Sequence, residues 1–263
     1  MTDSWKNGKA YDQFMGRWSK LVSKEFLTWF DAPSAQSWLD VGCGTGNLTR
    51  LILKTFQPGN IVSIDSSPGF IFHAKKTITH PLVNFSVSYA QTLGLLSKSM
   101  DAVISGLVLN FVPEPEAAIA EMMRVTKPGG KIGAFVWDYA NGMQFLRYFW
   151  NAAIAADREA AAFDEGSRFP VCQNGQLANM FQMAGLQQIE AKSIEIKTEF
   201  QNFDDYWQPF LGNVGAAPSY LKRLGKKEKQ ILEDLLRNTL PTNQNGSISL
   251  SARAWAVKGI VQK

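Results

Sequence analysis

The segment Trp38-Leu39-Asp40-Val41-Gly42-Cys43-Gly44-Thr45-Gly46-Asn47-Leu48-Thr49 decides the fold of this chain. An apolar run enters three alternate glycines and an amphipathic stretch follows, which predicts a buried strand, a tight loop and a helix. Glycines at this density allow positive φ and let a ligand lie against main chain that a Cβ would obstruct. The dinucleotide fingerprint is spaced G-x-G-x-x-G, whereas this chain has G-x-G-x-G followed by Asn47. The segment therefore predicts a nucleoside-cofactor loop that holds no pyrophosphate.

The loop resembles the first motif of the class I S-adenosylmethionine (AdoMet) dependent methyltransferases, an acidic residue followed by G-x-G-x-G. The resemblance implies that Asp40 serves the ammonium of AdoMet or the amides of the loop. It also implies that the loop wraps the methionine end of the cofactor, and the expected contact residues are Gly42, Cys43, Gly44, Gly46 and Asn47. From the residues alone, the alternative is a glycine-rich turn without a ligand.

A second acidic position ends the next apolar run. Asp65 follows Ile61-Val62-Ser63-Ile64 and lies 23 residues beyond Gly42. In doubly wound folds, an ionised side chain at this strand end accepts hydrogen bonds from ribose hydroxyls. We expect Asp65 and the adjacent Ser66 to bind the cofactor in this way. The alternative is that Asp65 caps the following helix, and both roles are compatible.

Two further strand ends complete the expected cofactor site. After the strand pattern Val83 to Ser88, the family usually has an acidic residue for the adenine amine, where this chain has Tyr89. We expect the amide of Ala90 and the side chain of Gln91 to address adenine instead. The stretch from Asp101 to Val112 resembles the fourth motif, which implies that its turn faces the reacting methyl. Its cofactor residues are expected to be Ser105 and Gly106.

This turn carries no Asp/Asn-Pro-Pro-aromatic signature, which enzymes that methylate nucleic-acid bases commonly have. Next, Pro113 to Glu116 predicts a helix start. The stretch Lys127 to Lys131 predicts a helix stop and a tight turn before a strand from Ile132 to Trp137.

The N-terminal segment from Tyr11 to Phe30 has apolar residues at helical spacing. Its beginning resembles the entry arm of small-molecule methyltransferases, which closes over the cofactor. The resemblance implies that Tyr11 and Arg17 hold the AdoMet carboxylate, since a guanidinium matches a carboxylate geometrically. The alternative is a packed tyrosine and a surface arginine.

The acceptor is expected beyond the fifth strand, where an aromatic stretch and an alanine-rich helix from Asn151 to Ala162 extend the chain. We expect Asp138 and Tyr139 to act as general base or to position the acceptor, because both leave the sheet on the cofactor side. Met143, Trp207 and Phe210 are expected to form an apolar substrate wall, with packing of the core as the alternative. His73 and His80 fall in or just after the second predicted helix, which packs on the flank of the sheet, so we assign them structural or surface roles.

Composition excludes several classes. The chain has 27 basic and 23 acidic side chains, and a net charge of +4 with both signs interspersed is weak support for nucleic-acid binding. The basic run from Lys222 to Lys229 fits the solvated face of a helix. Cys43 and Cys172 are not spaced like metal ligands or a redox pair, so we expect no metal site. Two cysteines without a disulfide framework also fit a protein of the reducing cytoplasm, which is the localisation we expect. No run approaches the ~18 apolar residues of a membrane span, and residues 1–9 lack a signal peptide's apolar core.

The sequence therefore predicts an α/β fold with a Rossmann-like, mostly parallel seven-stranded sheet, helices on both faces and an inserted helical lid. We expect one methyltransferase domain over residues 1–263. Its parts are an N-terminal arm (1–37), an AdoMet-binding core (38–137), two lid insertions (138–183 and 201–245) and two final strands (186–200 and 247–261).

The expected function is methyl transfer from AdoMet to an oxygen, nitrogen or carbon atom of a small molecule, by in-line displacement. The alternatives are a noncatalytic AdoMet-binding or RNA-interacting protein and a nicotinamide-dependent oxidoreductase. Asn47 and the absence of a dehydrogenase motif oppose the last of these. We expect neither a membrane nor a nucleic-acid partner, and no feature of the sequence indicates an oligomeric state.

Overall fold

The structure is a computed structural model and describes residues 15–34, 36–212 and 214–262. Helices and strands alternate in the first part of the chain: α2 (Arg17–Phe30), β1 (Ser37–Val41), α3 (Asn47–Phe56), β2 (Asn60–Asp65), α4 (Pro68–Thr77), β3 (Val83–Val87), β4 (Met100–Gly106), the 3-10 turn η2 (Leu109–Phe111), α5 (Pro115–Val125) and β5 (Thr126–Trp137).

The remainder of the chain is mostly helical and contains two long strands. In order, the elements are α6 (Gln144–Ala156), η3 (Arg158–Ala162), α7 (Glu165–Arg168), η4 (Pro170–Cys172), α8 (Gln176–Met183), β6 (Gln187–Phe200), α9 (Phe203–Trp207), η5 (Gln208–Leu211), α10 (Ala216–Leu221), α11 (Lys226–Thr239) and β7 (Ile248–Ile260).

The seven strands form one sheet in the order β3-β2-β1-β4-β5-β7-β6. The strands from β3 to β5 are parallel, with Trp38 of β1 between Ile61 of β2 and Ala102 of β4. From β1 the chain moves outward to β2 and β3, and from β4 it moves the other way to β5. The connections thus reverse between β1 and β4, and ligands of open α/β sheets bind at the carboxyl ends of strands at such a switch point.

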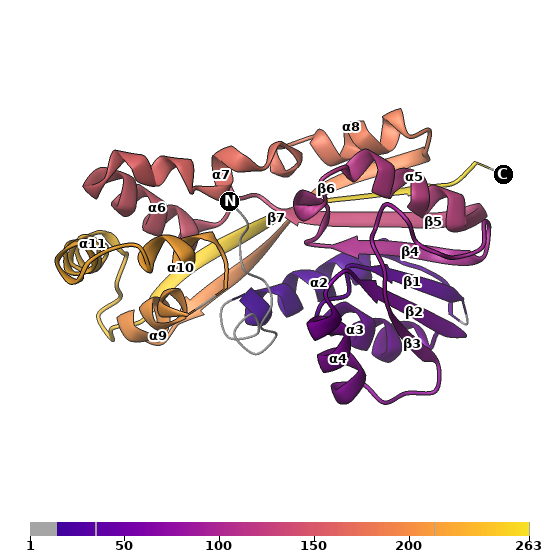
Figure 1. Cartoon of the computed structure of the whole chain (residues 1–263), viewed down its shortest axis with the longest axis horizontal. Coiled ribbons are helices and arrows are strands. Elements are labelled where there is room, and N and C mark those ends of the chain that lie inside the picture. The colour runs from indigo at the N-terminus through magenta and orange to yellow at the C-terminus, as the bar shows by residue number, and fades with distance from the viewer. Residues whose placement is uncertain (1–14, 35, 213, 263) are drawn as a thin grey trace. The chain divides into compact units, whose positions relative to one another are not determined.

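The reversal also explains the two helical layers. Right-handed crossovers in opposite directions place α3 and α4 on one face of the sheet and α5 on the other. Figure 1 shows this arrangement, with α8 on the same side as α5. Strand β7 departs from the parallel direction of strands β3 to β5. The amide of Asp138 donates to the carbonyl of Arg253 and that of Gly129 to the carbonyl of Val261, so β5 and β7 are antiparallel. The predicted fold class is confirmed.

The described residues cluster into two compact units. The sheet unit contains Ser19–Val136, Val171–Ile194 and residues 254–262, and the helical unit contains residues 15–18, Trp137–Pro170 and Glu195–Arg253. The predicted division into one domain with an arm and two lid segments stays a prediction.

Aromatic side chains form the core of each unit. In the sheet unit, the ring centroids of Phe26 and Phe135 lie 4.6 Å apart. A Cβ on Gly133 would lie 2.7 Å from the ring of Phe30, so this glycine lets α2 pack closely on β5. In the helical unit, Phe149 and Phe210 are stacked with centroids 4.6 Å apart. Both aromatic cores are almost fully buried, which anchors the elements around them.

The structure differs from the sequence prediction at two places. The stretch Lys127 to Gly130 was predicted as a turn but lies within β5, where Thr126 pairs with Met100 and Lys131 with Ala102. The extra residues are accommodated as an irregularity of the strand, and two hydrogen bonds to Val261 hold Gly129 and Gly130. The alanine-rich helix predicted from Asn151 to Ala162 ends earlier, at Ala156, because Asp157 caps a separate 3-10 turn.

Candidate cofactor and active site

The glycine loop connects β1 to α3 and has the backbone conformation that its sequence predicts. Gly42, Gly44 and Gly46 have φ angles of 76°, 54° and 83°. The amides of Gly42 and Cys43 both donate to the carbonyl of Ile64 at 2.8 Å, which ties the loop to the end of β2. Positive φ at all three glycines keeps the main chain of the loop bare, as a close ligand requires.

The surroundings of the glycines differ. A Cβ on Gly42 would lie 2.4 Å from a methyl group of Val108, so this glycine is needed for packing. A Cβ on Gly46 would lie 2.5 Å from Ile78, whereas at Gly44 it would meet no atom within 4 Å. Gly44 therefore borders open space. Asn47 is the first residue of α3, and Cys43 packs against Ile71 and Phe85 in a small apolar cluster.

Asp65 links the loop to the end of β2. Its Oδ2 accepts from the amide of Gly44 at 3.0 Å, and its Oδ1 accepts from the amide of Ser67 at 2.8 Å. Burial raises the pKa of Asp65, and the two amides oppose this shift. Ser67 itself caps α4, while the predicted contact residue Ser66 is exposed. The capping alternative for Asp65 is therefore wrong, because Asp65 holds the amide of the cap residue and does not cap the helix itself. Asp65 also lines a cavity.

Asp40 lies beneath the loop in a buried polar network. Its Oδ2 accepts from the hydroxyl of Thr49 at 2.6 Å, and that hydroxyl also contacts the hydroxyl of Ser63 at 2.8 Å. Oδ1 of Asp40 is buried and has no hydrogen-bond partner among the residues that the structure describes. Burial raises the pKa of Asp40 to about 7, although the hydrogen bond from Thr49 opposes the shift. An unpartnered acceptor of this kind suits a cationic group or the amides of the loop.

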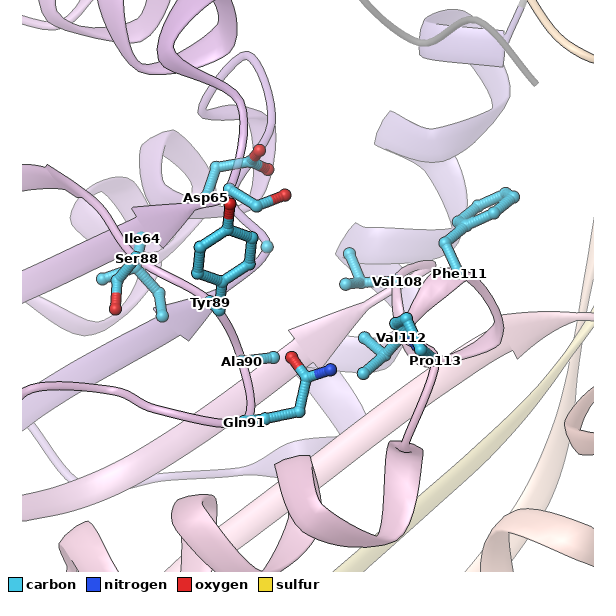
Figure 2. Close-up of a pocket in the computed structure, with 12 residues that line it drawn as sticks. Ile64, Asp65, Ser88, Tyr89, Ala90, Gln91, Val108, Phe111, Val112 and Pro113 are labelled. Carbon is cyan, nitrogen blue, oxygen red and sulfur yellow. The ribbon is translucent and has the colours of Figure 1, made fainter. Parts of the chain in front are cut away.

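A cavity of about 330 Å³ opens at the carboxyl ends of β1, β2, β3 and β4. Figure 2 shows Asp65 and Tyr89 on one side, Val108 and Phe111 on the other, and Gln91 extending between them. The complete lining is Gly42, Ile64, Asp65, Ser66, Ser88, Tyr89, Ala90, Gln91, Val108, Phe111, Val112 and Pro113. The volume lies at the lower end of the range for small-ligand sites, which is about 300–1,000 Å³.

The cavity brings together five of the predicted cofactor residues, and other predicted residues lie around it. Gly42, Asp65, Ser66, Ala90 and Gln91 line the cavity. Ser105 is fully buried and donates to the carbonyl of Val41, while Gly106 leaves no room for a Cβ beside Phe135. These two residues hold the ends of β1, β4 and β5 together. Their predicted contact with the cofactor stays a prediction.

The apolar side of the cavity was missed by sequence reasoning. Val108, Phe111, Val112 and Pro113 all follow the end of β4. The signal was present in their position, because the turn after a central parallel strand lies at the carboxyl edge of the sheet. Their apolar side chains fit a flat ring or an aliphatic group.

The residues predicted for the carboxylate and the acceptor lie in or near the helical unit. Tyr11 lies outside the described residues. Arg17 donates to Oδ1 and Oδ2 of Asp205 at 3.0 and 3.2 Å, and its guanidinium lies 4.4 Å from the ring centroid of Trp18 and 4.7 Å from that of Phe200. The arginine is thus held by a carboxylate of the protein itself, and its role toward AdoMet stays a prediction.

Asp138 and Tyr139 follow β5 and are both buried. Oδ2 of Asp138 accepts from Nη2 and Nε of Arg253 at 2.6 and 2.9 Å, and Oδ1 accepts from the amide of Asn141. Both oxygens of the carboxylate thus already accept hydrogen bonds from the protein, which favours positioning over general base catalysis. Tyr139 packs beside Phe169, with ring centroids 5.8 Å apart.

Met143, Trp207 and Phe210 were predicted to form the substrate wall. Their exposed fractions are 0%, 5% and 1%, which places them inside the helical unit, as the packing alternative expected. Contact between these side chains and an acceptor stays a prediction.

No group of three or more His, Cys, Asp or Glu side chains in residues 15–34, 36–212 and 214–262 is arranged to hold a metal ion. No helix in these ranges is long and apolar enough to cross a bilayer.

Comparison with known proteins gives consistent matches. The methyltransferase-domain family matches residues 39–134. The chain is 30% identical to a demethylmenaquinone methyltransferase of Staphylococcus aureus over 167 residues, which covers 59% of this chain and 69% of that protein. It is 30% identical to a malonyl-[acyl-carrier protein] O-methyltransferase of Hahella chejuensis over 123 residues, which covers 47% of this chain but only 44% of the relative.

A solved structure matches over nearly the whole chain. It is the phosphoethanolamine N-methyltransferase 2 of Haemonchus contortus in complex with S-adenosyl-L-methionine, with a TM-score of 0.61 and 14% identity. The match covers 99% of this chain and 58% of that one. At this identity the likeness concerns the fold.

Proposed function

Because the chain belongs to the class I S-adenosylmethionine-dependent methyltransferases, we propose that it transfers the methyl group of AdoMet to a small-molecule acceptor. The observation that carries this proposal is the bare backbone at Gly44, which borders open space next to the carboxylate of Asp65. A Cβ would occupy the space that Gly44 leaves free. The residues present therefore fit an adenosyl ligand at the carboxyl edge of the sheet.

Each part of the cofactor has a chemically suitable partner in this arrangement. Asp65 supplies carboxylate oxygens for ribose hydroxyls, and Ala90 and Gln91 supply an amide and a side-chain amide for adenine. Val108 and Phe111 offer apolar surface on the opposite side. The free oxygen of Asp40 suits the ammonium of the methionine end, either directly or through the amides of the loop.

The chemistry requires little of the protein beyond binding and alignment. AdoMet supplies a methyl group that its sulfonium already activates. The chain has to align a nucleophile in line with that methyl at about 3 Å and exclude water. Asp138, held by Arg253, and the neighbouring Tyr139 are our candidates for positioning the acceptor. The related proteins named above act on demethylmenaquinone and on malonyl-[acyl-carrier protein], which supports an acceptor other than a nucleic acid.

Label transfer tests the proposal. The protein is incubated with AdoMet labelled in its methyl group and a cell extract, which is afterwards separated into small-molecule, RNA and protein fractions. We expect label in the small-molecule fraction, and none with protein inactivated by heating. Label confined to RNA or protein, or a protein that binds S-adenosylhomocysteine but transfers nothing to any fraction, would contradict the proposal.

A further inference from the structure

Asn110 is a buried polar residue that the functions described so far leave unused. It lies in η2, directly after β4, and its exposed fraction is 8%. Its Nδ2 is buried and has no hydrogen-bond partner in the part of the chain that the structure describes. Buried amide groups nearly always have partners, because an unmade hydrogen bond costs the full desolvation of the donor. A donor left free at the edge of a candidate active site therefore calls for a functional explanation.

The geometry of η2 separates Asn110 from the cofactor cavity. The amide of Phe111 donates to the carbonyl of Val108, which closes a turn of three residues. Residues three apart in a 3-10 turn share one face, and Val108 and Phe111 both line the cavity. Leu109 takes a second direction into the core, with 1% exposure. Asn110 lies between Leu109 and Phe111 in the turn and is not among the residues that line the cavity.

The same turn is pressed against the loop expected to hold the methionine end. The methyl groups of Val108 fill the space where a Cβ of Gly42 would lie, at 2.4 and 2.5 Å. Leu107, at the start of the turn, has a φ of 62°, which is unusual for a residue with a branched side chain. Figure 2 shows Val108 across the cavity from Asp65 and Tyr89. Asn110 follows Val108 by two residues, in the same turn that packs against this loop.

We propose that Nδ2 of Asn110 donates a hydrogen bond to an oxygen atom of the methyl acceptor and so orients the nucleophile. The inference rests on the proposed methyl transfer and narrows its acceptor to molecules that carry a hydroxyl, enolate or carboxylate oxygen near the methylated atom. A side-chain amide is neutral and does not take up a proton at neutral pH, so Asn110 orients the acceptor and does not deprotonate it.

Two variants remove a buried, unpartnered polar group at different places. Asn110→Leu replaces the amide with an apolar side chain of similar volume. Thr198→Val is the matched control, because Thr198 on β6 is fully buried and its Oγ1 also has no partner among the described residues. Neither variant is expected to unfold at a lower temperature than the wild type, since each removes an unsatisfied group.

The variants are compared by thermal unfolding, by calorimetry with S-adenosylhomocysteine and by the rate of label transfer to the small-molecule fraction. Asn110→Leu is expected to bind S-adenosylhomocysteine within about twofold of the wild type and to transfer label at least about tenfold more slowly. Thr198→Val is expected to match the wild type in both measurements.

Three results would overturn the inference. A clear loss of S-adenosylhomocysteine binding in Asn110→Leu would assign the amide to the cofactor. An unfolding temperature well below that of Thr198→Val would assign it to the core, and undiminished label transfer would leave it without a role. If the wild type itself transfers no label, the proposed function fails and the inference with it, and that outcome is distinct because it appears before any variant is compared.

Discussion

The backbone amide of Gly44 donates a hydrogen bond of 3.0 Å to Oδ2 of Asp65, and so joins the glycine loop after β1 to the end of β2. Asp65 is therefore both an anchor of the loop and the expected acceptor for ribose. The second oxygen of the carboxylate accepts from the amide of Ser67. Loss of this one side chain is expected to affect the loop, the start of α4 and the ligand together.

Replacement of Asp65 tests that double role. Asp65→Ala removes the acceptor for ribose and the anchor of Gly44, and is expected to weaken S-adenosylhomocysteine binding by at least about tenfold, or about 1.4 kcal/mol. Asp65→Asn keeps the shape but turns an NH₂ group toward one of the two amides, so an intermediate loss is expected. Calorimetry gives the affinities and thermal unfolding the stability. Unchanged affinity in Asp65→Ala would refute the ribose assignment.

Gly44 and Gly94 form a matched pair for the glycine loop. Their φ angles are 54° and 64°, and a Cβ on either would meet no atom within 4 Å. Alanine at each position carries the same left-handed penalty of about 1–2 kcal/mol, so similar losses of stability are expected. Neither glycine lines the cavity, but the amide of Gly44 donates to Asp65, which does line it, whereas Gly94 lies outside the glycine loop. Only Gly44→Ala should lose binding of S-adenosylhomocysteine, and equal affinity in both variants would place the ligand elsewhere.

The buried carboxyl of Asp40 predicts an unusual pH dependence of stability. Its pKa is raised to about 7 in the folded chain from 3.8, so the folded state holds a proton that the unfolded state releases between these values. The contribution of Asp40 to the free energy of unfolding is therefore greatest below pH 3.8. It falls by about 4 kcal/mol in total as the pH rises to 7. Asp40→Asn cannot titrate. Urea unfolding at pH 5 and pH 8 should show the wild type losing more stability than the variant, and parallel pH profiles would contradict the prediction.

The sequence predicted where the glycine loop and the acidic strand end lie, because local patterns determine these positions. Gly42, Gly44 and Asp65 lie at strand ends whose order along the chain follows from the alternation of strands and helices. The apolar side was missed because the resemblance to the fourth motif assigned cofactor contacts only to Ser105 and Gly106. The neighbouring position of β1 and β4 is what brings the turn with Val108 and Phe111 to the loop.

The partners of long charged side chains were also not predictable from the sequence. Arg17 and Asp205 are 188 positions apart, and their contact depends on tertiary packing. The same holds for Asp138 and Arg253, which are 115 positions apart. Sequence spacing identifies which groups are available for a carboxylate or an acceptor. It does not show which of them another side chain already occupies.

The ion pair of Arg17 and Asp205 yields variants with opposite effects. If Arg17 holds the AdoMet carboxylate, Asp205 competes for it, so Asp205→Ala is expected to strengthen AdoMet binding and Arg17→Met to weaken it, each several-fold. Binding of adenosine, which has no carboxylate, should be unaffected in both variants. Each partner is about 30% exposed, so the coupling energy from a double-mutant cycle of unfolding should be about 0.5–1 kcal/mol. If both variants change the affinity for AdoMet in the same direction, competition between Asp205 and the AdoMet carboxylate for Arg17 is excluded.

Phe210 distinguishes core packing from a substrate wall. Its ring is stacked on Phe149 with an interplanar angle of 6° and is 1% exposed, so Phe210→Ala is expected to destabilise the chain by about 3–5 kcal/mol. Phe210→Leu keeps most of the volume and should remain folded at 25 °C. S-adenosylhomocysteine affinity is the control, because Phe210 lies outside the lining of the cofactor cavity. A changed pattern of labelled products in Phe210→Leu, at unchanged cofactor affinity, would assign Phe210 to the acceptor wall. An unchanged pattern together with the expected loss of stability in Phe210→Ala would assign it to the core, because a residue that only packs alters how much enzyme is folded and leaves the choice of acceptor as it was.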